Sequence, residues 1–350
     1  MASERRAGRL HGKDNHLQFS GHFVDAADVR RIAAAFHNLT GKLGYTDVDL
    51  DFRGCTRVFP GMMVGLCALA SKYRTDGVEI SLRLPSATYL RNLFINSGWA
   101  YLINPENQPR SRYSGVHHLG CLQFSSPTEQ QQLVSRFVNT LLGMVENLRR
   151  EDLAAIEWSL NELTDNVLNH ADCRAGGVVH LSHFRKANLI DFSIADAGAG
   201  IPRTLRGVLG SNTSDVDAVD KAIREGVTRD PARFQGNGLF GAFRIAEICK
   251  GHFSVHSGYA SLNFGKQGLH LRTEPIPYPG TLITASLDCS SPETLAEALH
   301  FKGQKHVPTD YVELHYETAN DERFKFRMRA ESESFGSRVA RSLFATSWPT

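Results

Sequence analysis

The sequence of 350 residues lacks several features that would assign it to a class at once. No stretch approaches the roughly 18 uncharged apolar residues of a membrane-spanning helix, so we expect no membrane span. The net charge is only +2, which gives no electrostatic reason to expect nucleic acid or an anionic membrane as a partner. Residues 1–16 are basic but have no apolar core, so they predict a loose tail and not a signal peptide.

Cysteine is scarce and scattered. The 6 cysteines form no CxxC pair and no His/Cys pair at zinc spacing, which predicts reduced thiols in a cytoplasmic protein. The 15 histidines are equally dispersed, and we expect structural or surface roles for them. The 41% hydrophobic and 22% charged residues are ordinary for a folded chain, and the length allows two or three domains.

Residues 17–107 have the pattern of a small α/β unit. Apolar and polar residues alternate over 48–52 and 78–84, as in half-buried strands. The stretches 60–72 and 87–97 follow these strands and predict packed helices. Strand, helix, strand, helix predicts a parallel-sheet layer.

Residues 104–127 are rich in Pro, Ser, Gly and Asn and predict a linker over residues 108–127. Ser126, with proline next to it, predicts the start of a long helix that reaches about residue 147. A second helix is expected from about residue 150 to 170. Residues 203–235 are polar and predict a loop with one short helix near 216–225. The remaining expected elements are strands over 178–181, 189–194, 253–256 and 282–287 and a helix over 239–249.

The first segment with chemical meaning is 161–170, NELTDNVLNH. Its apolar residues, with those at 156 and 160, have helical spacing and form a buried stripe, whereas Glu162 and Asn166 lie one turn apart on another face. An amide oxygen can bind Mg²⁺, and a carboxylate can polarise a water or hydroxyl beside a γ-phosphate. On its own, such a pair is typical of a solvated helix surface.

Three glycine-containing segments follow. In the segment 194–202, IADAGAGIP, Asp196 stands at the end of an apolar strand, where it can accept a hydrogen bond from an exocyclic amine such as that of adenine. The segment 236–241, GNGLFG, opens a helix and exposes backbone N–H groups to an anion. It does not follow a strand directly, which argues against a Rossmann dinucleotide site. The segment 279–281, PGT, leads into a strand.

In this order and spacing, the four segments resemble the N box and the three glycine boxes of the ATP-binding domain shared by gyrase, heat-shock chaperones, histidine kinases and MutL. The resemblance extends over residues 151–287. It implies a Bergerat-type α/β sandwich, a mixed sheet under helices, within residues 128–290. A mobile lid would cover the nucleotide over residues 203–235. The whole chain would then be an α/β and α+β multidomain protein.

The resemblance also implies roles for individual residues. Glu162 would be the catalytic carboxylate, Asn166 would bind Mg²⁺, and Asp196 would accept the adenine amino group. The implied ligands are ATP and Mg²⁺. The ATP-binding residues would be Asn166, Asp196, Gly198, Gly200, Gly236, Gly238, Gly241 and Thr281.

Within this family, the compact domain looks most like the anti-sigma-factor serine kinases. No histidine occurs between residues 119 and 169, so the preceding helix lacks the acceptor of an orthodox histidine kinase, although another chain can supply one. Residues 17–107 are similar to STAS domains, the substrates of those serine kinases. The place of the phosphorylated serine reads VFPGM, residues 58–62, without a hydroxyl. We therefore expect a docking or scaffold unit; an unrelated small α/β layer remains the alternative.

Residues 291–350 predict two strands, 311–316 and 324–328, and a helix starting in 334–343. This pattern faintly resembles the start of another STAS-like module, with a plain hairpin and helix as the alternative. The resemblance implies an ATP-binding regulator that hydrolyses ATP or transfers its γ-phosphate to a Ser or Thr of a partner, such as a STAS-domain or sigma-factor-like regulator. Two alternatives stay open: a non-catalytic ATP sensor, and a homodimeric clamp that closes on ATP.

Overall fold

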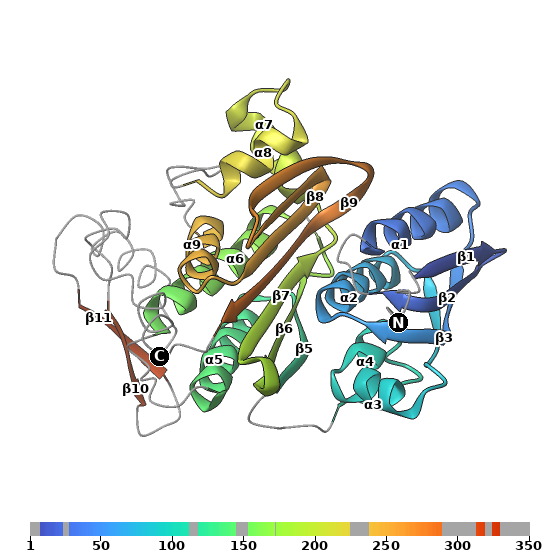
Figure 1. Ribbon diagram of the computed structural model, residues 1–350, viewed down its shortest axis with the longest axis horizontal. Helices are drawn as coiled ribbons and strands as arrows, with labels where there is room; N and C mark the ends of the chain where they lie inside the picture. The colour runs from blue at the N-terminus through green and yellow to red at the C-terminus, as the bar shows by residue number, and fades with distance from the viewer. Residues whose placement is uncertain are drawn as a thin grey trace, which may run out of the picture.

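The protein has a mixed α/β fold in a computed structural model (Figure 1). The structure describes residues 8–23, 28–111, 118–144, 153–171, 173–224 and 238–288, and the strands β10 (Glu313–Thr318) and β11 (Phe324–Arg329). In these ranges, no helix is long and apolar enough to cross a membrane. The five cysteines within them are free thiols.

The N-terminal sheet is four-stranded, in the order β1–β2–β3–β4. Its strands are β1 (Arg9–Lys13), β2 (His16–Phe23), β3 (Asp47–Val58) and β4 (Glu79–Arg83). The strands β2, β3 and β4 pair in parallel; the alternation of strands and helices predicts this for β3 and β4, whereas the strand β2 was not predicted. β1 is antiparallel to β2 and corrects the expectation of a loose tail over 1–16. The side chains of β1 are mostly exposed, so its sequence has no apolar alternation that would predict a strand. Backbone pairing with β2 places it in the sheet.

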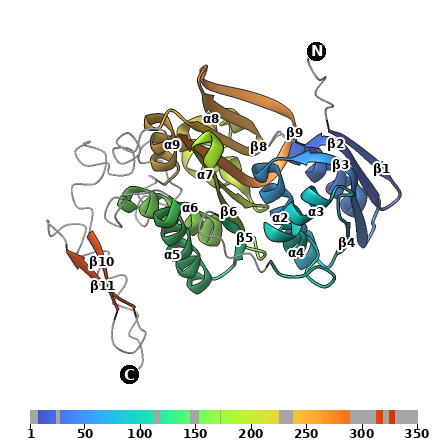
Figure 2. The same ribbon diagram turned by 60° about the horizontal axis from the view of Figure 1, so that its bottom comes forward.

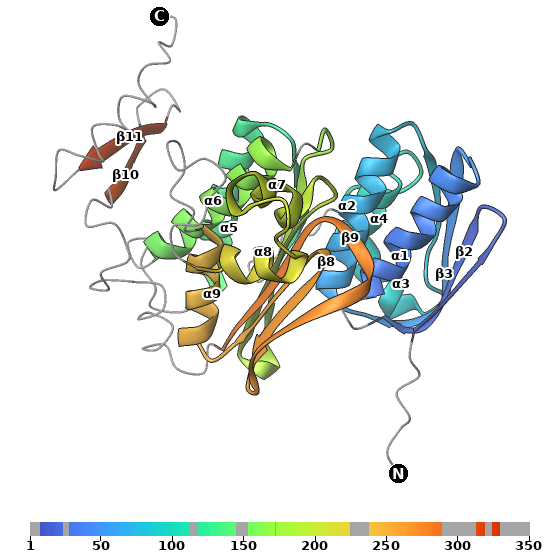
Figure 3. The same cartoon turned by 90° about the horizontal axis from the view of Figure 1, so that it is seen from above.

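The N-terminal helices are α1 (Asp28–Phe36), the π-helical turn η1 (His37–Lys42), α2 (Pro60–Thr75), α3 (Thr88–Asn96) and α4 (Trp99–Ile103). Every residue of α2 from Gly61 to Ser71 is buried. A helix that is apolar all round is buried on all sides. In the view from above, α1 and α2 lie between the N-terminal sheet and a second sheet (Figure 3).

The second sheet is five-stranded, in the order β5–β6–β7–β9–β8. Its strands are β5 (His118–Phe124), β6 (Gly177–Phe184), β7 (Leu189–Asp196), β8 (His252–Gly265) and β9 (Gly268–Asp288). All neighbouring strands are antiparallel, not mixed as the resemblance implies, because β9 returns from its hairpin with β8 and inserts beside β7. β5 lies inside the expected linker 108–127; the polar composition around it hid a strand whose Leu119 and Cys121 are buried.

Helices α5 (Pro127–Met144), α6 (Ala154–His170) and α9 (Gly238–Ile248) cover the face of this sheet opposite α2 (Figures 1 and 2). The predicted stripe of α6, which includes Leu160, Leu163 and Val167, is buried in their shared core. The predicted start of α5 is confirmed, since Ser126 Oγ accepts a hydrogen bond from the Glu129 N–H at 3.3 Å. A short 3₁₀ turn, η3 (Arg185–Ala187), joins β6 to β7.

Two helices occupy the first part of the expected loop 203–235. α7 (Gly200–Leu209) was missed, because its buried side consists of little more than Pro202 and Leu205. α8 (Asp215–Ala222) was predicted, and its cap Ser214 accepts a hydrogen bond from the Asp217 N–H at 3.1 Å. Residues 225–235 of the expected lid, and the expected helix at 334–343, lie outside the described residues. The strands β10 and β11 form the antiparallel hairpin predicted for the C-terminal region.

Candidate functional site

Glu162 and Asn166 stand one turn apart on α6, as the sequence predicts. Glu162 is half-buried, Asn166 is exposed, and neither side chain has a hydrogen-bond or ion-pair partner among the described residues. Burial, with the nearby carboxylate of Asp165, raises the pKa of Glu162 to about 7. A carboxylate that titrates near neutral pH and has no partner is suited to accept a proton.

Gln130 of α5 holds in place Asp165, whose carboxylate adds to the effect of burial in raising the pKa of Glu162. Its side-chain amide donates to Asp165 Oδ1 at 2.8 Å and to the Thr164 hydroxyl at 2.9 Å. Gln130 lies on the buried side of α5, which a polar residue occupies at a cost unless it is hydrogen-bonded. A polar residue in register with the apolar stripe of α5 is the sequence signal that would have identified it.

The N-terminus of α9 packs directly on this part of α6. A Cβ on Gly238 would collide with the Cβ of Glu162 and lie 3.3 Å from the Leu163 nitrogen. The first-turn N–H groups of a helix lack intrahelical partners and attract anions. Gly241 is buried one turn further along α9, and Gly236 lies outside the described residues.

Asp196 ends β7 and is only 4% exposed. Burial raises the pKa of its carboxyl to about 7, although hydrogen bonds from the backbone of Gly198 and Thr281 favour the ionised form. The Gly198 N–H donates to Asp196 Oδ1 at 2.8 Å, and the Tyr278 hydroxyl donates to the Asp196 carbonyl at 3.1 Å. The structure thus brings together Asp196, Gly198 and Thr281, three residues that the resemblance implies for the adenine end, and adds Tyr278.

The loop after β7 is held between β9 and α6. Gly280 has a φ of +85°, and a Cβ there would lie 2.6 Å from both Asp196 Oδ1 and the Gly198 nitrogen, so only glycine fits. On the other side, the Ala199 N–H donates to the Ala171 carbonyl at 2.5 Å, immediately after α6 ends. α6 therefore connects the Asp196 loop at one end with Glu162 and α9 further along.

Ser257 of β8 locks the start of α7, where Gly200 is the first helical residue. Its hydroxyl donates to the Gly280 carbonyl at 2.7 Å and accepts from the Ile201 N–H at 2.8 Å. Sequence reasoning missed this residue. The Ser-Gly pair at 257–258 inside the strand is a weak signal, since glycine inside a strand often marks an irregularity.

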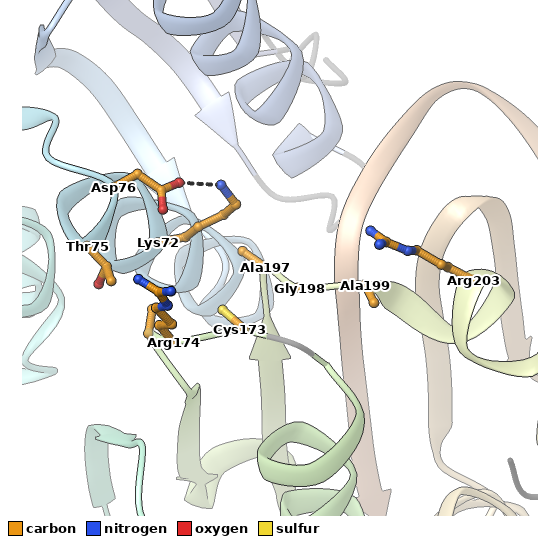
Figure 4. A pocket seen from close by; sticks show the side chains of 10 residues that line it. Lys72, Thr75, Asp76, Cys173, Arg174, Ala197, Gly198, Ala199 and Arg203 are labelled. Carbon is orange, nitrogen blue, oxygen red and sulfur yellow. Dashed lines mark hydrogen bonds and ion pairs between the residues drawn. The ribbon is translucent and has the colours of Figure 1, made fainter.

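A cavity of about 310 Å³ adjoins the Asp196 loop from the side of α2 (Figure 4). Its cationic side chains are Lys72, Arg174 and Arg203, and its one carboxylate, Asp76, pairs with Lys72 at 2.6 Å. Neither Glu162 nor Asn166 lines it, so it is separate from the α6–α9 part of the site. Its other lining residues are Thr75, Cys173, Ala175, Ala197, Gly198 and Ala199.

The described residues contain no group of three or more His, Cys, Asp or Glu side chains that could hold a metal ion by themselves. The Asn166 amide, which has no hydrogen-bond partner among the described residues, fits a cation whose other ligands come from a bound phosphate, as Mg²⁺ usually binds. No protein-family model and no curated protein matches the chain. The geometry of α6, α9 and the Asp196 loop is therefore the basis for assigning a function.

Proposed function

We propose that this chain binds ATP with Mg²⁺ in the space bordered by α6, the Asp196 loop and α9, and uses it chemically to regulate a protein partner. The layer of α5, α6 and α9 on one face of the five-stranded sheet supports a Bergerat-type nucleotide domain, although the strands of that sheet are antiparallel and not mixed. The parallel strands β2, β3 and β4 with α1 and α2 support a STAS-like N-terminal unit.

The observation that carries this proposal is the position of Glu162 and Asn166 on one face of α6, together with their lack of partners among the described residues. Both are polar side chains on one helix face, close to the N-terminus of α9, and neither has a partner in the part of the chain that the structure describes, which leaves them available to a ligand. A carboxylate that served only stability would be paired or fully solvated. Glu162 is neither, which favours catalysis over passive sensing of the nucleotide.

Each part of the site would meet a different part of ATP. The Asp196 carboxylate would accept a hydrogen bond from the adenine amino group. The first-turn N–H groups of α9 would face the phosphates. Asn166 would hold Mg²⁺, which supplies charge neutralisation on the phosphates. Glu162 would take the proton of the attacking hydroxyl group, either of water or of a Ser or Thr.

The acceptor of a transferred phosphoryl group would lie on another chain. Residues 58–62 of the N-terminal unit carry no hydroxyl, and Met62 and Met63 at the start of α2 are fully buried. That unit would therefore act as a fixed scaffold. This arrangement supports a partner-dependent kinase of the anti-sigma-factor type, or an ATPase.

Calorimetric titration with ATP tests the proposal, with and without Mg²⁺. We expect Mg²⁺-dependent binding by the wild type and loss of the Mg²⁺ dependence in Asn166→Ala. Asn169→Ala is the matched control, because Asn169 is an exposed asparagine of the same helix whose amide donates to the Asp165 carbonyl at 3.0 Å. Absence of ATP binding by the folded wild type would refute the proposal.

A further inference from the structure

Arg30 lies on α1 of the N-terminal unit, and its side chain extends into the hairpin formed by β8 and β9. This hairpin belongs to the second, five-stranded sheet, which forms the proposed nucleotide-binding domain. Its Nη1 donates to the carbonyl oxygens of Gly258 at 2.6 Å and Ile276 at 2.9 Å, and its Nη2 donates to that of Ala260 at 2.5 Å. The side chain is only 2% exposed. Because a buried cation is costly unless its donors are satisfied, these carbonyls hold the two Nη groups in one position, whereas the buried Nε has no hydrogen-bond partner among the described residues.

The hairpin is irregular where Arg30 holds it. The β8–β9 register shifts on both sides of Gly258, which pairs with Tyr278, whereas Ala260 pairs with Thr273. Residues 274–277 of β9 are left without a partner on β8. The Ile276 carbonyl, which the strand ladder does not use, is satisfied by Arg30 of the other unit. Arg30 thus stabilises a local geometry that strand pairing alone leaves open.

The same irregular stretch positions α7 and α8. Ser257 binds the Ile201 N–H at the start of α7, and the Tyr259 N–H donates to Asp215 at the start of α8 at 2.7 Å. These contacts flank the Gly258 carbonyl that Arg30 binds. The helices α7 and α8 follow the Asp196 loop and precede the remainder of the predicted lid.

We propose that Arg30 is a positioning residue through which the N-terminal unit controls the nucleotide site. By fixing residues 257–260, it holds α7 and α8, and with them the Asp196 loop, in the arrangement that admits ATP. A displacement of α1 by a partner docked on the N-terminal unit would release this stretch and lower the affinity for ATP. The nucleotide part of this inference rests on the proposed ATP binding.

The next residue of α1 supplies a matched control. Arg31 donates to the Gly8 carbonyl at 3.2 Å and to Asp28, both within its own unit. For Arg30, burial lowers the pKa of the guanidinium, against the electrostatic effects of Glu274, Tyr278 and Asp215, which favour its charge. The two arginines therefore share a helix and a charge but differ in the unit that they contact.

The test uses the full chain and the variants Arg30→Gln, Arg30→Lys and Arg31→Gln. Lysine keeps the positive charge but lacks the planar guanidinium that reaches three carbonyls. Arg30→Lys therefore tests the coupling to α7 and α8 even if Arg30→Gln does not fold. Hydrogen exchange of residues 200–222 is measured without nucleotide, and the Kd for ATP is measured by calorimetry. We expect faster exchange and at least about fivefold weaker ATP binding for both Arg30 variants. Arg31→Gln should match the wild type in both.

The two measurements separate the possible failures. Unchanged exchange in α7 and α8 in the Arg30 variants would overturn the coupling whatever the chain binds. Altered exchange with unchanged ATP affinity would overturn control of the nucleotide site. A wild type that does not bind ATP would refute the proposed function, while the exchange data would still decide whether Arg30 positions α7 and α8.

Discussion

Gly238, the first residue of α9, lies directly against Glu162 of α6. A methyl group on Gly238 would overlap the Cβ of Glu162, so the N-terminus of one helix begins on the surface of the other. The Glu162 carboxylate makes no hydrogen bond with a described residue and titrates near neutral pH. The N-terminus of α9 and a carboxylate without a partner among the described residues therefore lie side by side, an arrangement suited to a bound phosphate and an attacking hydroxyl.

The fit of Gly280 against Asp196 predicts a specific cost for adding a side chain. Gly280→Ala should lower the free energy of unfolding by about 1–2 kcal/mol for its positive φ, and further because Asp196 and the Gly198 nitrogen must move. Gly268→Ala is the matched control, since Gly268 has a φ of +87° but open space around it. Urea unfolding should show a larger loss for Gly280→Ala, and only that variant should weaken ATP binding. Equal losses would show that the close approach to Asp196 is unimportant.

The pKa of Glu162 predicts the pH dependence of turnover. A general base acts in its ionised form, so kcat at saturating ATP should rise with pH through about 7 and then level off. Asp165→Asn removes the smaller of the two causes of the raised pKa, so the inflection should move to lower pH without returning to that of a free glutamate. Initial rates across this range check both statements. A kcat that is flat, or that falls, between pH 6 and pH 8 would exclude Glu162 as the base.

Asp196 predicts discrimination between adenine and guanine. Asp196→Asn keeps the shape of the side chain but removes the charge, so ATP affinity at pH 8 should fall about tenfold, with a smaller change for GTP. Asp191→Asn is the control, because Asp191 is a buried aspartate of the same strand, outside the site. Competition between ATP and GTP for a fluorescent analogue measures the ratio. Equal effects of the two variants would remove Asp196 from the adenine site.

Asp191 itself predicts how stability depends on pH. Burial raises the pKa of Asp191 from 3.8 to about 7. As the pH rises, the unfolded chain therefore loses this proton at a lower pH than the folded protein does. The stability that this group contributes is complete below about pH 4 and is lost as the pH rises through about 7. Asp191→Asn should reduce the loss of unfolding free energy between pH 5 and pH 8, by a few kcal/mol at most. Urea unfolding at both pH values decides this, and an unchanged pH dependence would contradict it.

The sequence predicts best those elements that combine a clear period with an end signal. The helix α2 begins at Pro60 and the helix α5 at Pro127, and the strand β4 ends before Pro85. Glu162 and Asn166 share a helix face because their spacing requires it. The association of Asp196 with Gly198 and Thr281 was expected only from a family resemblance.

The features that the sequence did not predict depend on contacts between residues far apart in the chain. Neither β1 nor β5 has a strong apolar alternation, and each is placed by hydrogen bonds to a neighbouring strand. The burial of Arg30 results from packing between units, which the local pattern of α1 does not contain. Ser257 likewise gains its role only when Ile201 and Gly280 are brought next to it.

The most direct test of the central claim is incubation of the purified chain with γ-labelled ATP and Mg²⁺, beside Glu162→Gln. Free phosphate and labelled protein are both measured, and ATP binding is measured for each protein. We predict slow turnover by the wild type, and none by Glu162→Gln, which should still bind ATP. Turnover that persists in Glu162→Gln, or a wild type that binds ATP without consuming it, would contradict the assignment of Glu162 as the catalytic carboxylate.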